Sequence, residues 1–200
     1  EMLRSLVGSE MCIRDRGKTV VPEEKKVYLA FNKPRGIVCT AEKREKNNVI
    51  DYLSYPVRIY PVGRLDKDSE GLLLMTNDGA IVNGIMRARN RHEKEYQVEV
   101  NKEITPEFLK KMASGVPILD TVTRPCRIRK TGERSFTIIL TQGLNRQIRR
   151  MCEALGYRVT KLKRVRIMNV HLKDLKTGEY RPLTEKELAE LKKQIGEEKR

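Results

Sequence analysis

The chain has 200 residues, with 42 Lys and Arg against 27 Asp and Glu, and a formal net charge of +15. Its apolar content supports a packed core, which excludes a fully disordered chain, and no apolar run reaches the roughly 18 residues that a membrane span requires. The positive excess favours a polyanionic partner such as a nucleic acid, with a soluble basic protein as the alternative.

The cysteine pattern bears on metal binding and compartment. The four cysteines are widely separated and form no C-x-x-C pair: Cys12, Cys39, Cys126 and Cys152. They are expected to be reduced and mostly buried, and no structural metal is expected. The first residues also lack the apolar core of a secretory signal, so a cytoplasmic protein is expected.

Strand and helix patterns alternate irregularly after a tail without pattern at 1–16. Strands are predicted at 27–31, 37–40, 57–62, 71–76, 95–101, 126–129, 135–141, 157–162 and 166–172. Helices are predicted to begin after the turn 77–79, after Thr105, at Gln147 and after Thr184. The first two strands are expected to form a hairpin. Without strict β-α-β alternation, the expected fold class is α+β, with a mixed, mostly antiparallel sheet and flanking helices in one domain over 17–200.

Two of these elements have a defined apolar face. The helix after 77–79 is predicted to bury four residues: Ile81, Val82, Ile85 and Met86. The strand at 95–101 alternates so that Tyr96, Val98 and Val100 point inward. A core tyrosine is the ordinary outcome at Tyr96, although such a ring also serves as a stacking platform for a base.

Segment 63–71 (GRLDKDSEG) places three acids within five positions beside a predicted buried strand. Three interpretations are open: a calcium loop, a solvated acidic turn, or a site in which one acid acts as nucleophile or base. The calcium loop is disfavoured because its twelfth position is Asn77, where a bidentate Glu is needed.

A basic run follows further along the chain. From Arg146 to Arg166, eight Lys or Arg stand against one acid, Glu153. Arg146, Arg149 and Arg150 lie at a predicted helix start, where the helix dipole disfavours cations. This favours an anionic ligand or a carboxylate partner, with a solvated basic face as the alternative. The two histidines, His92 and His171, are expected to be non-catalytic.

The ordered segments 63–73, 94–98 and 145–151 resemble the RsuA-type branch of RNA pseudouridine synthases, and the resemblance runs from about residue 17 to 195. Members of this branch usually carry a small S4 RNA-binding domain before the catalytic region, and none is apparent upstream of Gly17. Segment 5–16 also resembles translated sequencing-adaptor sequence, so a non-native origin of the tail is one interpretation.

The resemblance implies the pseudouridine synthase catalytic fold and specific residue roles. Asp66 is the expected catalytic aspartate, Arg149 the basic residue paired with it, and Tyr96 the ring that stacks on the flipped base. Asp68 and Glu70 receive no catalytic role. The residues expected to bind RNA, from the resemblance and the basic run together, are Arg64, Arg146, Gln147, Ile148, Arg150, Lys161, Lys163 and Arg164. No cofactor or metal is implied, because nothing is oxidised and no phosphate bond breaks.

The implied activity is isomerisation of a specific uridine in 23S rRNA near the peptidyl-transferase region, with a transfer RNA uridine as a second candidate. Two alternatives stay open: a related synthase for another rRNA uridine, and a noncatalytic RNA-binding assembly factor. A monomer without membrane association is expected.

Overall fold

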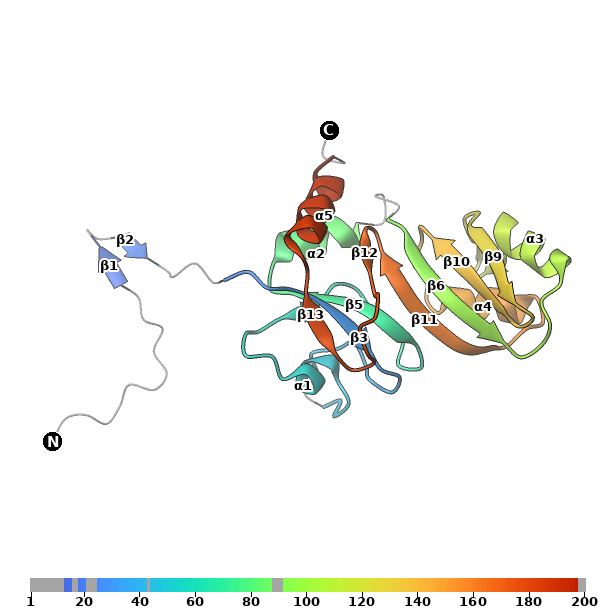
Figure 1. The fold of residues 1–200 in the computed structure, drawn as a ribbon, viewed down its shortest axis with the longest axis horizontal. Helices are drawn as coiled ribbons and strands as arrows, with labels where there is room; N and C mark the ends of the chain where they lie inside the picture. The colour runs from blue at the N-terminus through green and yellow to red at the C-terminus, as the bar shows by residue number, and fades with distance from the viewer. Residues whose placement is uncertain (1–12, 16–17, 21–24, 43, 88–91, 198–200) are drawn as a thin grey trace.

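The computed structural model describes residues 13–15, 18–20, 25–42, 44–87 and 92–197. Within them, a nine-stranded sheet extends from β13 (Tyr180–Pro182) at one end to β9 (Arg127–Gly132) at the other (Figure 1). In spatial order its main strands are β13, β3 (Tyr28–Lys33), β5 (Glu70–Thr76), β11 (Val159–Ile167), β6 (Lys94–Val100), β10 (Ser135–Leu140) and β9. Short strands β4 (Tyr60–Pro61) and β12 (Val170–His171) pair with β5 and β11.

Five helices and two small ladders complete the described fold. The helices are α1 (Val49–Leu53), α2 (Gly79–Met86), α3 (Pro106–Ser114), α4 (Gln147–Ala154) and α5 (Glu185–Glu197). The ladders pair β1 (Ile13–Asp15) with β2 (Lys18–Val20), and β7 (Pro117–Ile118) with β8 (Thr121–Val122).

The strand pairing confirms the α+β prediction, because every described ladder is antiparallel except β5 with β11. This parallel seam joins the two halves of the sheet, with Arg164 opposite Gly71. Gly71 has φ +108°, and a Cβ there would lie 2.2 Å from the Arg164 carbonyl oxygen. The close approach of the two backbones therefore requires glycine.

The half of the sheet that holds β3 and β5 is covered on both faces. In β5, Leu72 and Leu74 pack with residues of α2 and α5, whereas Leu73 and Met75 pack with residues of α1. All four side chains are buried, as expected for the continuous apolar run at 71–76.

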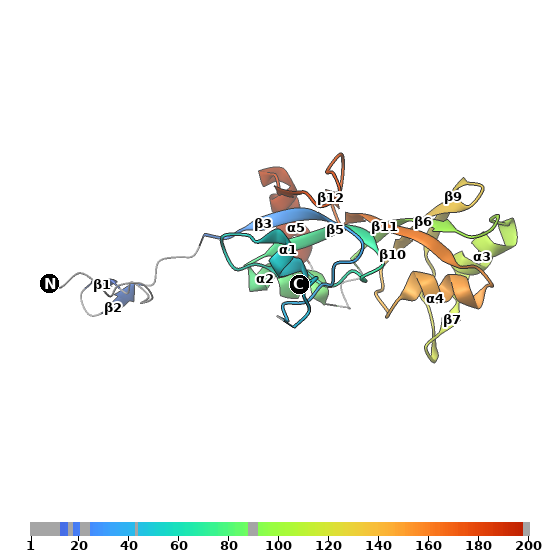
Figure 2. The same cartoon turned by 90° about the horizontal axis from the view of Figure 1, so that it is seen from below.

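The half that holds β6, β10 and β9 is covered on one face. Phe136, Ile138 and Leu140 of β10 pack with residues of α3 and α4. Figure 2 shows α4 on one side of β11 and β10. The alternate residues of β10 are only half-buried, and among the described residues no helix packs on that outer face.

Three of the predicted helices begin with a side-chain cap. Thr105 Oγ1 accepts from the Phe108 N–H at 3.1 Å at the start of α3. Thr184 and Glu187 form a reciprocal capping box before α5, with bonds of 3.0 and 3.1 Å. Asp78 accepts from the Ala80 N–H at the start of α2.

The hairpin predicted between 27–31 and 37–40 is wrong. Val38 makes only an isolated bridge with Asn48, and β3 pairs instead with β5 and β13. Both edges of β3 are occupied by strands that are distant in sequence, and the buried Lys33 ammonium donates to the carbonyls of Pro34 and Ile37 in the loop after β3.

The structure also differs from the predictions for individual strands and helices. The strands predicted at 157–162 and 166–172 are mostly one strand, β11, which shifts register against β6 and then turns back through β12. Met86 is 49% exposed because it ends α2, beyond the buried face. The β1–β2 ladder is not foreseen by the sequence, and residues 1–12 and 16 of the predicted tail lie outside the described residues.

Candidate active site

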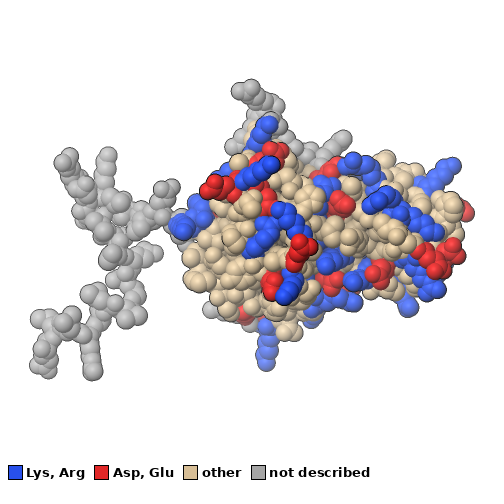
Figure 3. Space-filling view, viewed as in Figure 1, with Lys and Arg blue, Asp and Glu red and all other residues tan. Residues whose placement is uncertain are grey.

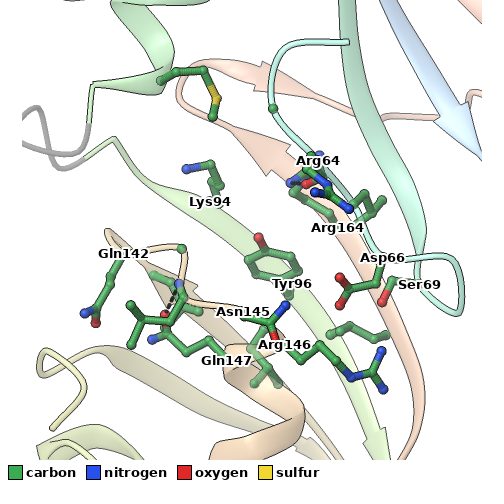
Figure 4. A pocket seen from close by; sticks show the side chains of 18 of the residues that line it. Arg64, Asp66, Ser69, Lys94, Tyr96, Gln142, Asn145, Arg146, Gln147 and Arg164 are labelled. Atoms are coloured by element: carbon green, nitrogen blue, oxygen red, sulfur yellow. Dashed lines mark hydrogen bonds between the residues drawn. The ribbon is translucent and has the colours of Figure 1, made fainter. Parts of the chain in front are cut away.

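A cleft of about 320 Å³ opens beside the parallel seam. Loop 63–69 forms one wall, and β6 and β11 form the floor. The loop that precedes α4 and the first turn of α4 form the other wall (Figure 4). The cleft therefore brings together the three sequence segments that carry the family resemblance.

Asp66 is the one acid among the described residues that line the cleft. The preceding residue, Leu65, is buried, and the Cys39 thiol bonds both its N–H and its C=O at 3.3 Å. The Ser69 N–H donates to the Asp66 carbonyl at 3.0 Å. These contacts fix the backbone, and the Asp66 carboxylate faces the Tyr96 ring in Figure 4.

Asp68, two residues further, pairs with Arg149, the residue that was expected to pair with Asp66, and also with Arg146. Arg146 donates to both Asp68 carboxylate oxygens at 3.0 Å. The Arg149 Nε lies 3.6 Å from Asp68 Oδ2, and its Nη2 donates to the Asp68 carbonyl and to Ser69 Oγ. Among the described residues, the Asp66 carboxylate makes no ion pair or side-chain hydrogen bond.

The predicted pairing of Arg149 with Asp66 is therefore replaced by pairing with Asp68. The bidentate Arg146 contact holds the pKa of the Asp68 carboxyl below its usual range. Burial lowers the pKa of Arg149, against the opposing effect of Asp68. An arginine still stays charged at neutral pH, so the acidic loop is tied to α4 by two guanidinium groups.

Arg146 and its neighbours shape the α4 wall. Arg146 is the N-cap of α4 with φ +49°, a left-handed conformation that few non-glycine residues adopt. Gln147 Oε1 accepts from the Leu144 N–H at 3.1 Å, and Ile148 is buried in the lining. Arg150 donates to the backbone and side chain of Asn145 and does not line the cleft.

The floor of the cleft carries Tyr96, Lys94 and Arg164. Tyr96 is half-buried and packs against the hydrophobic clusters on both sides of the seam. Arg164 is 3% exposed, and it donates from Nε to the Leu72 carbonyl at 2.7 Å and from Nη1 to the Arg64 carbonyl at 3.3 Å. Arg164 thus braces the loop that carries Asp66, whereas the Arg64 side chain is exposed at the rim.

Lys161 and Lys163 do not join the other predicted RNA-binding residues. They alternate along β11 with Leu162 and Arg164, which line the cleft. Both lysines line a separate hollow of about 190 Å³ on the other face of the sheet. Strand alternation explains the difference, since successive side chains point to opposite faces.

Sequence reasoning missed Lys94 as a lining residue. The signal was available, because Lys94 stands two positions before Tyr96 on one strand and therefore shares its face. His92 and His171 do not line the cleft. Within the described ranges, no three His, Cys, Asp or Glu side chains are grouped to hold a metal ion.

The fold and the cleft define an enzyme that acts on a nucleotide: a carboxylate that makes no ion pair with any other described residue faces an aromatic ring in a basic site on a mixed sheet. The chain belongs to the RNA pseudouridylate synthase family, whose family model matches residues 27–154. This match includes Asp66, Tyr96 and Arg149. No described helix is long and apolar enough to cross a membrane.

Individual relatives support the assignment. The dual-specificity RNA pseudouridine synthase RluF of Salmonella typhi is 51% identical over 198 residues, which cover 96% of this chain and 68% of that protein. The ribosomal large subunit pseudouridine synthase B of Bacillus subtilis (strain 168) is 36% identical over 180 residues, covering 86% and 74%. A crystal structure of a pseudouridylate synthase has a TM-score of 0.78 and 30% identity, covering 86% of this chain and 76% of that chain.

Proposed function

We propose that this chain converts one uridine of 23S rRNA to pseudouridine, with Asp66 as the nucleophile. The observation that carries this proposal is the placement of Asp66, which is the one acid among the described lining residues and faces Tyr96. Its backbone is braced on both sides, while its carboxylate keeps no ion pair within the described structure. Such a group is fixed in position and available to react.

The reaction balances without a redox partner. An Asp66 carboxylate oxygen bonds to C1′ of the ribose as the bond from C1′ to N1 breaks, and the electron pair of that bond stays on uracil. The base turns, C5 bonds to C1′, and the bond to Asp66 breaks. The C5 proton is lost and N1 gains a proton, so the product is an isomer of the substrate.

The neighbouring residues account for binding the nucleotide. Extruding a base from its stack costs a few kcal/mol, which stacking on Tyr96 and phosphate contacts offset. Arg64 at the rim is placed to bind a backbone phosphate, and Ile148 supplies an apolar contact beside the ring. Arg149 positions the loop of Asp66 through Asp68 and Ser69.

The names of the relatives support ribosomal RNA as the substrate. The relative from Bacillus subtilis is named for the large ribosomal subunit, and the relative from Salmonella typhi is named as dual-specificity. We therefore propose 23S rRNA as the main substrate and a transfer RNA uridine as the second, with a monomeric enzyme that acts in the cytoplasm.

The test follows tritium release from a 23S rRNA transcript labelled at C5 of uridine. The unchanged protein is expected to release tritium, and Asp66→Asn is expected to release none while its RNA affinity stays within about two-fold. Asp174→Asn changes an exposed aspartate away from the cleft and serves as the matched control with full activity. Turnover by Asp66→Asn would contradict the proposed mechanism, and a labelled transfer RNA tests the second substrate.

A further inference from the structure

Lys94 occupies the part of the cleft next to the proposed stacking ring. It lies on β6 two residues before Tyr96, so both side chains leave the same face of the strand. Both line the cleft, and Figure 4 shows Lys94 beyond the hydroxyl end of the Tyr96 ring. The mechanism described above gives this lysine no role.

The Lys94 ammonium makes no hydrogen bond or ion pair with any other described residue. Nearby cations contrast with it: Arg146 and Arg149 pair with Asp68, and the buried Lys33 donates to two carbonyls. Burial, followed by the charge of Arg164, lowers the pKa of Lys94. A half-buried cation without a counterion is unfavourable for folding, which is typical of a group kept for a ligand.

A second donor on the floor of the cleft also has no partner among the described residues. Arg164 Nη2 is buried without a hydrogen-bond partner, although Nε and Nη1 of the same guanidinium are both bonded. Lys94 and Arg164 both line the cleft, as does Asp66. Lys94 and Arg164 on the floor of the cleft thus each keep a donor that has no partner among the described residues, so this floor is suited to bind a negatively charged group.

We propose that Lys94 stabilises the negative charge that develops on uracil when the bond from C1′ to N1 breaks. The electron pair left on N1 spreads onto the two carbonyl oxygens of the ring. An ammonium beside a base stacked on Tyr96 donates a hydrogen bond to one of these oxygens and keeps its proton. Such a fixed donor acts mainly on the transition state, because the neutral base carries less charge on the same oxygen.

This inference rests on the proposed isomerisation, and the test separates the two. Lys94→Met removes the charge and keeps a long side chain, and Lys163→Met makes the same change on the opposite face of β11 and β6. Single-turnover tritium release at saturating enzyme, RNA affinity and melting temperature are measured for both variants. Lys94→Arg tests whether a positive charge restores part of the rate.

The expected result is a roughly 100-fold slower single turnover for Lys94→Met, with RNA affinity within about two-fold. The rate of Lys94→Arg should lie between those of Lys94→Met and the unchanged protein. The melting temperature of Lys94→Met should equal or exceed that of the unchanged protein, because an unpaired charge has been removed. Lys163→Met should leave the rate unchanged.

Three results for Lys94→Met would overturn the role of Lys94. The first is weaker RNA binding with an unchanged rate at saturation, which indicates a phosphate contact, and the second is no change in RNA affinity or in rate. The third is a lower melting temperature that accounts for the loss of rate. In each of these cases tritium release by the unchanged protein keeps the proposed function intact. Absence of release by the unchanged protein would instead remove the proposed function itself.

Discussion

Basic residues on the two faces of the same sheet differ in their burial and in their contacts. On the cleft face, Arg164 is buried and braces the loop of Asp66, and Arg149 is buried against Asp68 and Ser69. On the outer face, Lys161 and Lys163 line a separate polar hollow, and Lys161 lies 4.0 Å from Glu70. A basic run in the sequence is therefore not one basic surface in the fold.

Charges on the outer face largely compensate one another. Arg166 pairs with Glu93 at 3.0 Å and with Glu95 at 2.8 Å, and Arg127 also pairs with Glu93. In Figure 3, Lys and Arg side chains interleave with Asp and Glu over the half that holds β6, β9 and β10. We therefore expect the cleft face to dominate both RNA binding and catalysis.

The largest effect on the cleft face is expected at the seam that joins the two halves. Gly71→Ala would force a Cβ to 2.2 Å from the Arg164 carbonyl oxygen at a positive φ. We expect a loss of more than about 3 kcal/mol in the free energy of unfolding, measured by urea titration. Gly79→Ala is the control, because nothing lies within 4 Å of its Cβ and it starts α2. A stable Gly71→Ala would contradict the tight seam.

A smaller change in free energy, seen in the rate of catalysis, is expected for a substitution of Asp68. Asp68→Asn leaves Arg146 and Arg149 without their carboxylate, so the loop of Asp66 loses its tie to α4. We expect single turnover to slow by about 10- to 100-fold, which corresponds to about 1.4 to 2.7 kcal/mol. Glu70→Gln changes a neighbouring acid that faces Lys161 instead and should alter the rate less than about two-fold. Equal rates for the two variants would show that the Asp68 pairs do not position Asp66.

The smallest effect is expected on the outer face. The double change Lys161→Gln and Lys163→Gln should leave the rate at saturation unchanged and the RNA affinity within about three-fold. Arg64→Gln, at the cleft rim, should weaken binding more and reduce the salt dependence of affinity by about one phosphate contact. RNA affinity measured over a series of salt concentrations distinguishes the lysine double variant from Arg64→Gln. A larger loss of affinity for the lysine double variant would place RNA binding on the outer face and contradict the proposed dominance of the cleft face.

Local signals in the sequence predicted much of the fold. The caps at Thr105 and Thr184, the buried strand at 71–76 and the mixed sheet are set by short-range patterns, and the structure confirms them. The ordered motifs also predicted that Asp66 and Tyr96 would share one site, and both residues line the cleft.

Long-range geometry explains what the sequence did not predict. The choice of Arg149 between Asp66 and Asp68 depends on how loop 63–69 meets α4, which no spacing along the chain determines. The face that Lys161 and Lys163 occupy follows from the strand phase of β11, whereas a count of charges ignores that phase. The hairpin error has the same origin, because the partner of β3 is distant in sequence.

The most direct test of the account is to map pseudouridine in a 23S rRNA transcript after incubation with the protein, by chemical labelling and primer extension, with Asp66→Ala in parallel. One new modified uridine is expected with the unchanged protein and none with Asp66→Ala, although both proteins bind the RNA. The same modification with Asp66→Ala, or no modification by a folded protein that binds the transcript, would contradict the assignment of the cleft as the site of isomerisation.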